Sequence, residues 1–253
     1  MDVKAYLERI NYDGPLDVSA EALRRLQVAH LLSVPFENLS IHAGEPIILR
    51  DDALFTKIVT RRRGGFCYEV NGLFAALLRA LRFAVTMLSA EVARPNSEFS
   101  PPFDHMALMV QLEQPWLVDV GFGDSFLEPL RLDLTTEQIQ GAQAFKVVSD
   151  GEYEVVLRRD QDEWKPQYRL TLEPREFVDY EAMCQFHQTS PDSHFTQNRI
   201  CSLATADGRV TLSGMRVILT SKNGREERTL ASAEEYAAML REQFGIHEPV
   251  NIF

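Results

Sequence analysis

The sequence predicts an α+β protein with a helical N-terminal part, a strand-rich middle and a mixed C-terminal part. Apolar residues follow the helical period over residues 1 to about 82. From about 84 to 172 the pattern changes to short alternating segments, and after Pro174 both patterns occur. Many short strands in succession favour a barrel or a curled antiparallel sheet. A chain of 253 residues allows one or two domains with a further small module.

Three helices are expected in the N-terminal part. Ser19 can cap a helix that continues to Val34 and is ended by Pro35. Asp51 can cap a second, shorter helix. The third helix is expected to begin at Cys67, because the residues that follow have helical apolar spacing. Its apolar positions are Val70, Phe74, Leu77, Leu78 and Leu81.

The middle part contains six expected strands, and turn signals such as Asp150-Gly151 separate several of them. These strands are residues 84–92, 105–112, 116–120, 144–148, 153–159 and 167–172.

Beyond Pro174, residues 176–187 are expected to form a short helix. Strands are expected at 199–205, 209–212 and 215–221. Asn223-Gly224 predicts a hairpin turn. The segment from Ser232 to Glu235 is a capping box that opens a last helix, which Gly245 closes.

Charge and cysteine content narrow the class of protein. The formal net charge of −11 argues against generic nucleic-acid binding, so a polyanionic ligand would need a local basic or amide-lined site. Three cysteines form an odd set without the spacing of metal ligands. The start of the chain lacks the apolar core of a signal peptide, and no apolar run is long enough to span a bilayer. We therefore expect a cytoplasmic, reducing setting, in which a thiol nucleophile stays available.

The segment from Arg62 to Asn71, RRGGFCYEVN, contains the candidate nucleophile. Cys67 follows two glycines and stands at the expected start of a helix, where the helix N-terminus and nearby arginines favour the thiolate. The alternative for a lone cysteine is a small buried residue in a core helix.

A nucleophilic cysteine needs a base and a group that orients it, and His105 opens an expected strand with three aspartates nearby. Side chains alternate between the two faces of a strand, so Asp104 points away from His105. Asp119 falls on the face of His105 and Asp124 on the other, if residues 113–115 form the turn. Asp119 then lies several residues along the sheet, so the pair requires a bulge, a register shift or strong twist. Taken alone, such a pair is structural about as often as functional.

The residues that carry this chemistry occur in a pattern that resembles the arylamine N-acetyltransferases. The matching motifs are Pro35-Phe36-Glu37-Asn38-Leu39, Arg63-Gly64-Gly65-Phe66-Cys67 with Asn71, the His105 strand, Val118-Asp119-Val120-Gly121-Phe122-Gly123, Gln188-Thr189-Ser190-Pro191, Phe195-Thr196 and Cys201-Ser202. The resemblance covers residues 35 to about 202, and the combination is very specific.

The resemblance implies a Cys67, His105, Asp119 triad on a papain- or transglutaminase-like core. It implies a helical domain over residues 1–83, a β-barrel domain over 84–187 and an α/β lid over 188–253. Acetyl-CoA is the implied cosubstrate, without a metal, and arylamines, arylhydrazines or N-hydroxyarylamines are the implied acceptors. Nucleic acid and membranes are not expected partners, and the oligomeric state stays open between monomer and homodimer.

The resemblance also assigns binding residues. Gly123, Phe186 and Ser193 are expected to contact CoA, and Phe36 and Phe122 the acceptor. Asp192 and His194 stand where better-studied relatives carry small hydroxyl residues, which affects the expected CoA pose.

Four further expectations come from the same residues. Arg63 and Glu37 should form a buried ion pair behind the nucleophile, whereas Cys184 and Cys201 should only pack. Cys67 should rest as a thiolate beside a His105 imidazolium. Backbone amides near Cys67 should hold the oxyanion.

Three other functions remain open. The same triad would serve an amide synthase that releases a polyketide by forming an intramolecular amide. A cysteine hydrolase would pass the acyl group to water, and a binding or scaffold protein would form no acyl-enzyme at all.

Overall fold

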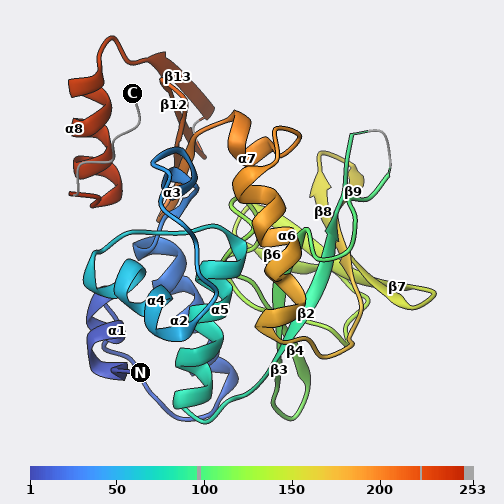
Figure 1. Cartoon of the computed structure of the whole chain (residues 1–253). Helices are drawn as coiled ribbons and strands as arrows, with labels where there is room; N and C mark the ends of the chain where they lie inside the picture. Colours follow the sequence, from blue (N-terminus) through green and yellow to red (C-terminus); the bar gives the residue numbers. More distant parts are fainter. Residues whose placement is uncertain (96–97, 223, 248–253) are drawn as a thin grey trace.

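The computed structural model describes residues 1–95, 98–222 and 224–247. Its N-terminal part is helical, as predicted (Figure 1). The helical elements there are α1 (Val3–Arg9), α2 (Ala20–Ser33), α3 (Leu39–His42), α4 (Asp51–Phe55), a π-helical turn (Thr56–Thr60) and α5 (Cys67–Ala80). Ser19 caps α2, and its side chain accepts a hydrogen bond from the Ala22 N–H. The predicted cap at Asp51 is wrong by one residue: Arg50 occupies the N-cap position and Asp51 is already helical.

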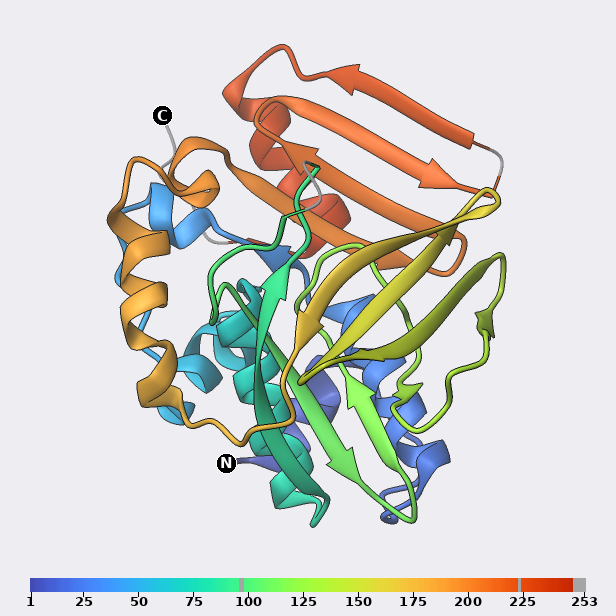
Figure 2. The ribbon, with the colours of Figure 1, turned by 90° about the vertical axis from the view of Figure 1, so that its right-hand side faces the viewer.

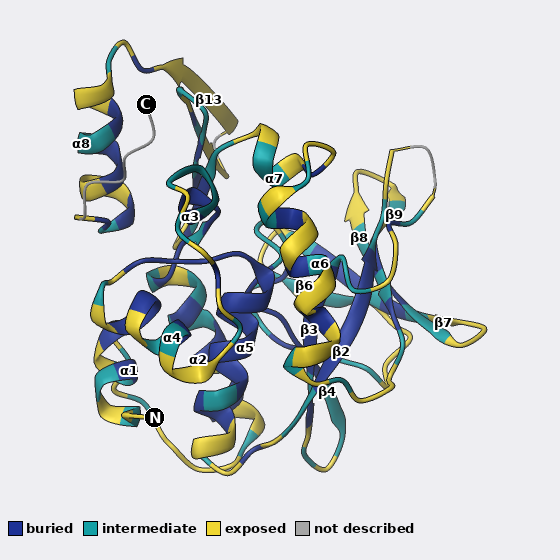
Figure 3. Ribbon diagram, in the orientation of Figure 1, coloured by how far each residue is buried: buried dark blue, intermediate teal, exposed yellow. Residues whose placement is uncertain are grey.

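Helix α5 is the centre of the main core. Most of its residues are buried, and Figure 3 shows it dark blue along its first turns and exposed only at its C-terminal end. A helix that is apolar on every face must be enclosed by other elements. Strands β2 (Ala84–Val92) and β3 (His105–Gln111) contact one side of α5, and α1, α4 and α6 (Phe177–Thr189) contact it elsewhere. The helix that begins at Cys67 is therefore held rigidly.

The middle of the chain forms an antiparallel sheet of eight strands in the order β5-β4-β3-β2-β9-β8-β7-β6. The strands after β3 are β4 (Pro115–Val118), β5 (Leu130–Arg131), β6 (Gln138–Gln140), β7 (Gln143–Asp150), β8 (Tyr153–Asp160) and β9 (Glu163–Leu170). Because β5 also contacts β7, the sheet curls into a nearly closed barrel. This confirms the predicted barrel.

Two strands of the barrel, β5 and β6, were not predicted. Both are too short to show alternation, and side chains join them: the Gln138 amide oxygen accepts from the Arg131 N–H at 2.7 Å, and its amide nitrogen donates to the Arg131 carbonyl at 2.9 Å. The predicted strand to Val120 ends earlier, at Val118.

A second antiparallel sheet of five strands, β1-β10-β11-β12-β13, lies beside the barrel, with α8 (Ala233–Phe244) packed on one face (Figure 2). Its C-terminal strands are β10 (Ile200–Thr205), β11 (Gly208–Ser213), β12 (Arg216–Ser221) and β13 (Gly224–Thr229). Strand β1 (Phe36–Glu37) comes from the helical part and pairs with β10. The division of the chain at residues 83 and 187 stays a prediction.

Local signals in the C-terminal part agree with the structure in most respects. Strands β12 and β13 pair as a hairpin, although Asn223 of the predicted turn lies outside the described residues. Ser232 caps α8, but the Glu235 carboxylate accepts from the Ala231 N–H instead of completing the box at Ser232. Among the described residues, no helix has the length and apolar character that crossing a membrane requires.

Candidate active site

Cys67 is the first residue of α5, and close backbone packing fixes its approach. Gly64 lies against the Pro35 carbonyl, where a Cβ atom would come within 1.9 Å of the oxygen. The Gly65 N–H donates to that carbonyl, and the Gly65 carbonyl accepts from the Glu37 N–H at 3.0 Å. The glycines therefore let the lead-in to Cys67 dock on β1, a role that only the tertiary structure reveals.

His105 and Asp119 form the predicted pair. Nε2 of His105 lies 2.7 Å from Oδ2 of Asp119, and both residues are 3% exposed. A turn at 113–115 would have put Asp119 opposite Met109, but β3 and β4 pair Met109 with Leu117. This shift of two residues brings Asp119 nearer to His105. Because the shift is an even number of residues, Asp119 stays on the same face of the sheet as His105. Because Nε2 is bound to the carboxylate, Nδ1 is left for proton transfer.

Asn71 connects the nucleophile helix to the aspartate. Its amide nitrogen donates to Asp119 Oδ1 at 2.9 Å and to the Met106 carbonyl at 2.7 Å, and its oxygen accepts from the Val120 N–H at 2.8 Å. Gly121 follows directly, and a Cβ atom there would lie 2.7 Å from the Cys67 Cα. One side chain on α5 thus sets the position of the loop that carries the carboxylate.

Burial disfavours the charged forms of both Asp119 and Cys67. Burial opposes ionisation of Asp119, but the attraction and hydrogen bond of His105, with the Asn71 and Gly121 donors, hold its pKa below the usual range. Burial raises the pKa of the Cys67 thiol well above its ordinary value; a backbone hydrogen bond at Met106 opposes this, and the charge of Asp104 adds to it.

The expected activation of Cys67 by arginines is wrong. Arg63 and Arg61 are directed to carboxylates: Arg63 lies 2.9 Å from Glu37, and Arg61 lies 3.2 Å from Glu45. A Cys67 thiolate therefore depends on the imidazole as its counter-charge.

The predicted Arg63–Glu37 pair is part of a larger buried cluster. Arg63 Nε donates to Glu37 Oε1 at 3.0 Å, and both side chains are almost fully buried. Lys57, from the π-helical turn, lies 2.6 Å from Glu69, whose other oxygen accepts from the Phe66 N–H. The sequence analysis missed Lys57 and Glu69, because a lysine and a glutamate in amphipathic segments give no sign of burial.

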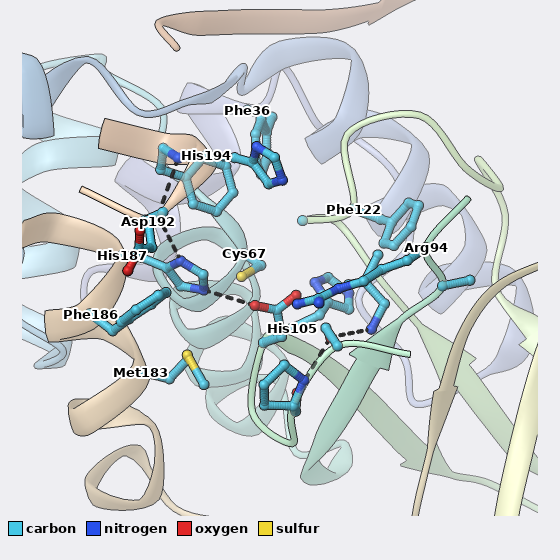
Figure 4. Close-up of a pocket in the computed structure, with 18 of the residues that line it drawn as sticks. Phe36, Cys67, Arg94, His105, Phe122, Met183, Phe186, His187, Asp192 and His194 are labelled. Carbon is cyan, nitrogen blue, oxygen red and sulfur yellow. Dashed lines mark hydrogen bonds and ion pairs between the residues drawn. The ribbon is translucent and has the colours of Figure 1, made fainter. Parts of the chain in front are cut away.

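A cavity of about 920 Å³ opens at Cys67 (Figure 4). Its lining includes His105, Phe36, Phe122, Phe186 and Ser193, which are five of the predicted site residues. Phe122 packs edge-on against His105 with 5.2 Å between ring centroids. Gly123 is not part of this lining; it lies one residue beyond Phe122 with φ of +92°. Its contact with CoA stays a prediction.

Two pairs of aromatic residues lie at the cavity. The ring centroids of Phe36 and Phe195 lie 6.1 Å apart, and the ring of Phe122 contacts that of Tyr168. The volume falls in the range of small-molecule sites. Among the described residues, no group of three or more His, Cys, Asp or Glu side chains is arranged to hold a metal ion.

The sequence analysis also missed a second histidine and carboxylate contact in this cavity. His187 Nε2 lies 3.2 Å from Asp104 Oδ1, the interaction drawn from His187 in Figure 4. Asp104 lies just before β3 and is directed toward α6. The sequence analysis excluded Asp104 as the partner of His105, but it contained nothing that placed α6 beside it.

A cysteine at a helix start beside a histidine and carboxylate pair, in a largely apolar cavity, is the geometry of enzymes that form an acyl-cysteine. A family model for N-acetyltransferases matches residues 19–251. The arylamine N-acetyltransferase of Mycolicibacterium smegmatis is 34% identical, over 97% of this chain and 92% of its own. The proansamycin X synthase of Amycolatopsis mediterranei is 33% identical, over 94% of this chain and 95% of its own.

The comparison with solved structures leads to the same family. The arylamine N-acetyltransferase of Mycobacterium marinum in complex with CoA superimposes with a TM-score of 0.91 and 34% identity, over 97% of this chain and 93% of that chain. The chain belongs to the arylamine N-acetyltransferase family.

Proposed function

We propose that this protein transfers the acetyl group of acetyl-CoA to arylamines, arylhydrazines or N-hydroxyarylamines through an acetyl-Cys67 intermediate. The observation that carries the proposal is the 2.7 Å contact between His105 and Asp119 at the wall of the cavity that Cys67 lines. A base that a carboxylate orients, beside a cysteine, is what covalent acyl transfer requires.

In the first half-reaction, the Cys67 thiolate attacks the acetyl carbonyl of acetyl-CoA, with its former proton held on Nδ1 of the His105 imidazolium. The new C–S bond forms as the bond to CoA breaks, and the leaving thiolate takes the proton from the imidazolium. Asp119 holds the tautomer and favours the charged ring. Backbone N–H groups near Cys67 stabilise the oxyanion.

In the second half-reaction, the amine nitrogen attacks the acetyl-Cys67 carbonyl and gives a proton to His105. The C–N bond forms, the C–S bond breaks, and the electron pair stays on sulfur beside the imidazolium. CoA must leave first, because donor and acceptor reach the same atom.

The binding roles follow the walls of the cavity. Phe122 and Phe36 provide aromatic surface for the acceptor ring, and Phe186 and Ser193 border the side on which we place CoA. Gly123 would let the pantetheine arm pass beside the turn. We also propose the division into parts at residues 83 and 187, with the last part covering the cavity.

The experiment is intact mass spectrometry after incubation with acetyl-CoA. One added acetyl group, absent in Cys67→Ala, supports the proposal, and its removal by an arylamine, with formation of the acetylated amine, completes it. Loss of acetyl-CoA without an amine would instead identify a hydrolase. A protein that never gains the acetyl group would not be an acetyltransferase.

The similarity to proansamycin X synthase favours one second candidate. An amide synthase would use the same triad but would take a long acyl chain that carries its own amine. The same experiment separates the two, because an amide synthase would not release an acetylated arylamine.

A further inference from the structure

The cavity has a second pair of ionisable groups on the side of Cys67 that faces away from His105. In Figure 4, Cys67 lies between His187 and His105. Asp104 lies just before the start of β3 and meets His187 of α6 at 3.2 Å. Both residues of this contact line the cavity. The mechanism above uses neither of them.

The His187 ring is fixed in place. Its Nδ1 lies 3.0 Å from Ser193 Oγ, and that hydroxyl also accepts from the Phe195 N–H at 3.2 Å. The ring stacks on Tyr68 with 6.1 Å between ring centroids, and it contacts Phe195 edge-on with 5.1 Å between centroids. With its side chain 7% exposed, His187 is a rigid support for the Asp104 carboxylate.

Asp104 has capacity for a further hydrogen bond. Burial opposes its ionisation, but the contacts with His187 and Ser100 outweigh this and hold its pKa below the usual value, so the group is charged at neutral pH. A carboxylate has about four acceptor positions, and its side chain is still 22% exposed. Asp104 and Cys67 line the same cavity.

We propose that Asp104 binds the acceptor substrate, by accepting a hydrogen bond from the N–H beside the attacking nitrogen, and so favours arylhydrazines over arylamines. This inference rests on the proposed acetyl transfer. An arylhydrazine attacks acetyl-Cys67 with its terminal nitrogen, which loses one proton to His105 as the C–N bond forms and the C–S bond breaks. The inner N–H, which His105 does not deprotonate, is then the donor available to Asp104 in the cavity wall. An arylamine has no inner N–H to offer.

The test separates the half-reactions. Enzyme is first acetylated with acetyl-CoA and freed of excess donor, and acetyl-Cys67 is confirmed by intact mass. Its deacetylation rate is then measured with phenylhydrazine, with N-methyl-N-phenylhydrazine, which lacks the inner N–H, and with aniline. Asp104→Asn removes the charge without changing the size, and Asp192→Asn makes the same change elsewhere in the cavity lining.

A hydrogen bond to a charged group corresponds to roughly tenfold or more in rate. We expect the wild type to prefer phenylhydrazine over its N-methyl analogue by about that factor. Asp104→Asn should remove most of the preference, and Asp192→Asn should retain it. Changing the residue and the substrate N–H separately and together isolates the hydrogen bond between them, as in a double-mutant cycle.

Equal losses for all three acceptors in Asp104→Asn would overturn the inference and leave Asp104 a packing residue. If that variant does not fold, a wild type that fails to distinguish the two hydrazines would also overturn it. Failure of the acetyl transfer itself would appear earlier, as missing acetyl-Cys67.

Discussion

The two sides of the N-terminus of α5 use buried charge differently. On the cavity side, Cys67 shares the wall with His105, which is paired with Asp119 and whose second ring nitrogen is left for a reacting proton. On the far side, Glu37, Arg63 and the Lys57–Glu69 contact neutralise one another almost completely.

The two sides differ in which polar groups remain available to a substrate. The far-side cluster uses its donors on carboxylates and on the backbone, which stabilises the fold but leaves nothing for a substrate. The cavity side keeps a thiol and a ring nitrogen accessible to a substrate, which costs stability but allows chemistry. A mutation on the cavity side should therefore lower the rate, and one on the far side should lower the melting temperature.

The largest expected effect is that of Cys67→Ala, which should abolish acetyl transfer while the protein stays folded. The side chain lies at the cavity and has no part in the ion-pair cluster. Activity and thermal melting on the same preparation measure both sides of the comparison. A Cys67→Ala variant that still transfers acetyl groups at the wild-type rate would refute the assignment of the nucleophile.

Asp119→Asn should slow acetylation by roughly 10²–10⁴-fold, because the imidazole can adopt the wrong tautomer. It should also raise the pH at which Cys67 becomes reactive. Burial raises the thiol pKa, so the thiolate needs the imidazolium, and Asp119 stabilises that cation directly at 2.7 Å. Its own charge opposes the thiolate, but from farther away.

The measurement is the rate of Cys67 alkylation against pH in both proteins, and the midpoint belongs to the coupled pair. Burial alone would put the wild-type midpoint above that of a free thiol, ~8.5, and we expect pairing with the imidazolium to bring it below that value. A wild-type midpoint at or above that value would mean that His105 acts as a general base on a neutral thiol.

Arg63→Ala and Glu37→Ala should each destabilise the protein by about 3–5 kcal/mol, because the remaining charge is left buried without its partner. Rates per folded molecule should change far less. Chemical denaturation of each variant gives the free energy of unfolding, and Arg24→Ala, which breaks a half-exposed pair with Glu128, is a suitable control. A free energy unchanged in both variants would show that the cluster does not stabilise the fold.

The smallest expected effect is a change of acceptor preference in Phe122→Ser. The ring borders the cavity and touches His105 edge-on, so its loss should change relative rates among arylamines by up to about tenfold. Cys67 acetylation by acetyl-CoA should stay near the wild-type rate. A uniform loss for every acceptor would indicate that Phe122 only supports the histidine.

The sequence by itself predicted where helices give way to strands and that His105 pairs with Asp119. Periodicity separated helices from strands, because burial of one face imposes a period of 3.6 or 2 on the chain. Strand parity selected Asp119 over its neighbours, because side chains alternate whatever the sheet does later. The motif from Arg63 to Cys67 led to the family.

Only the tertiary structure decided the register, the burial and the partners. The pairing of Met109 with Leu117 brings Asp119 to His105, and the position of the expected turn did not predict this register. The π-helical turn buries Lys57, and α6 brings His187 to Asp104 across more than eighty residues of chain. Such contacts depend on how whole elements pack, and a local pattern contains no information about which element arrives from elsewhere in the chain.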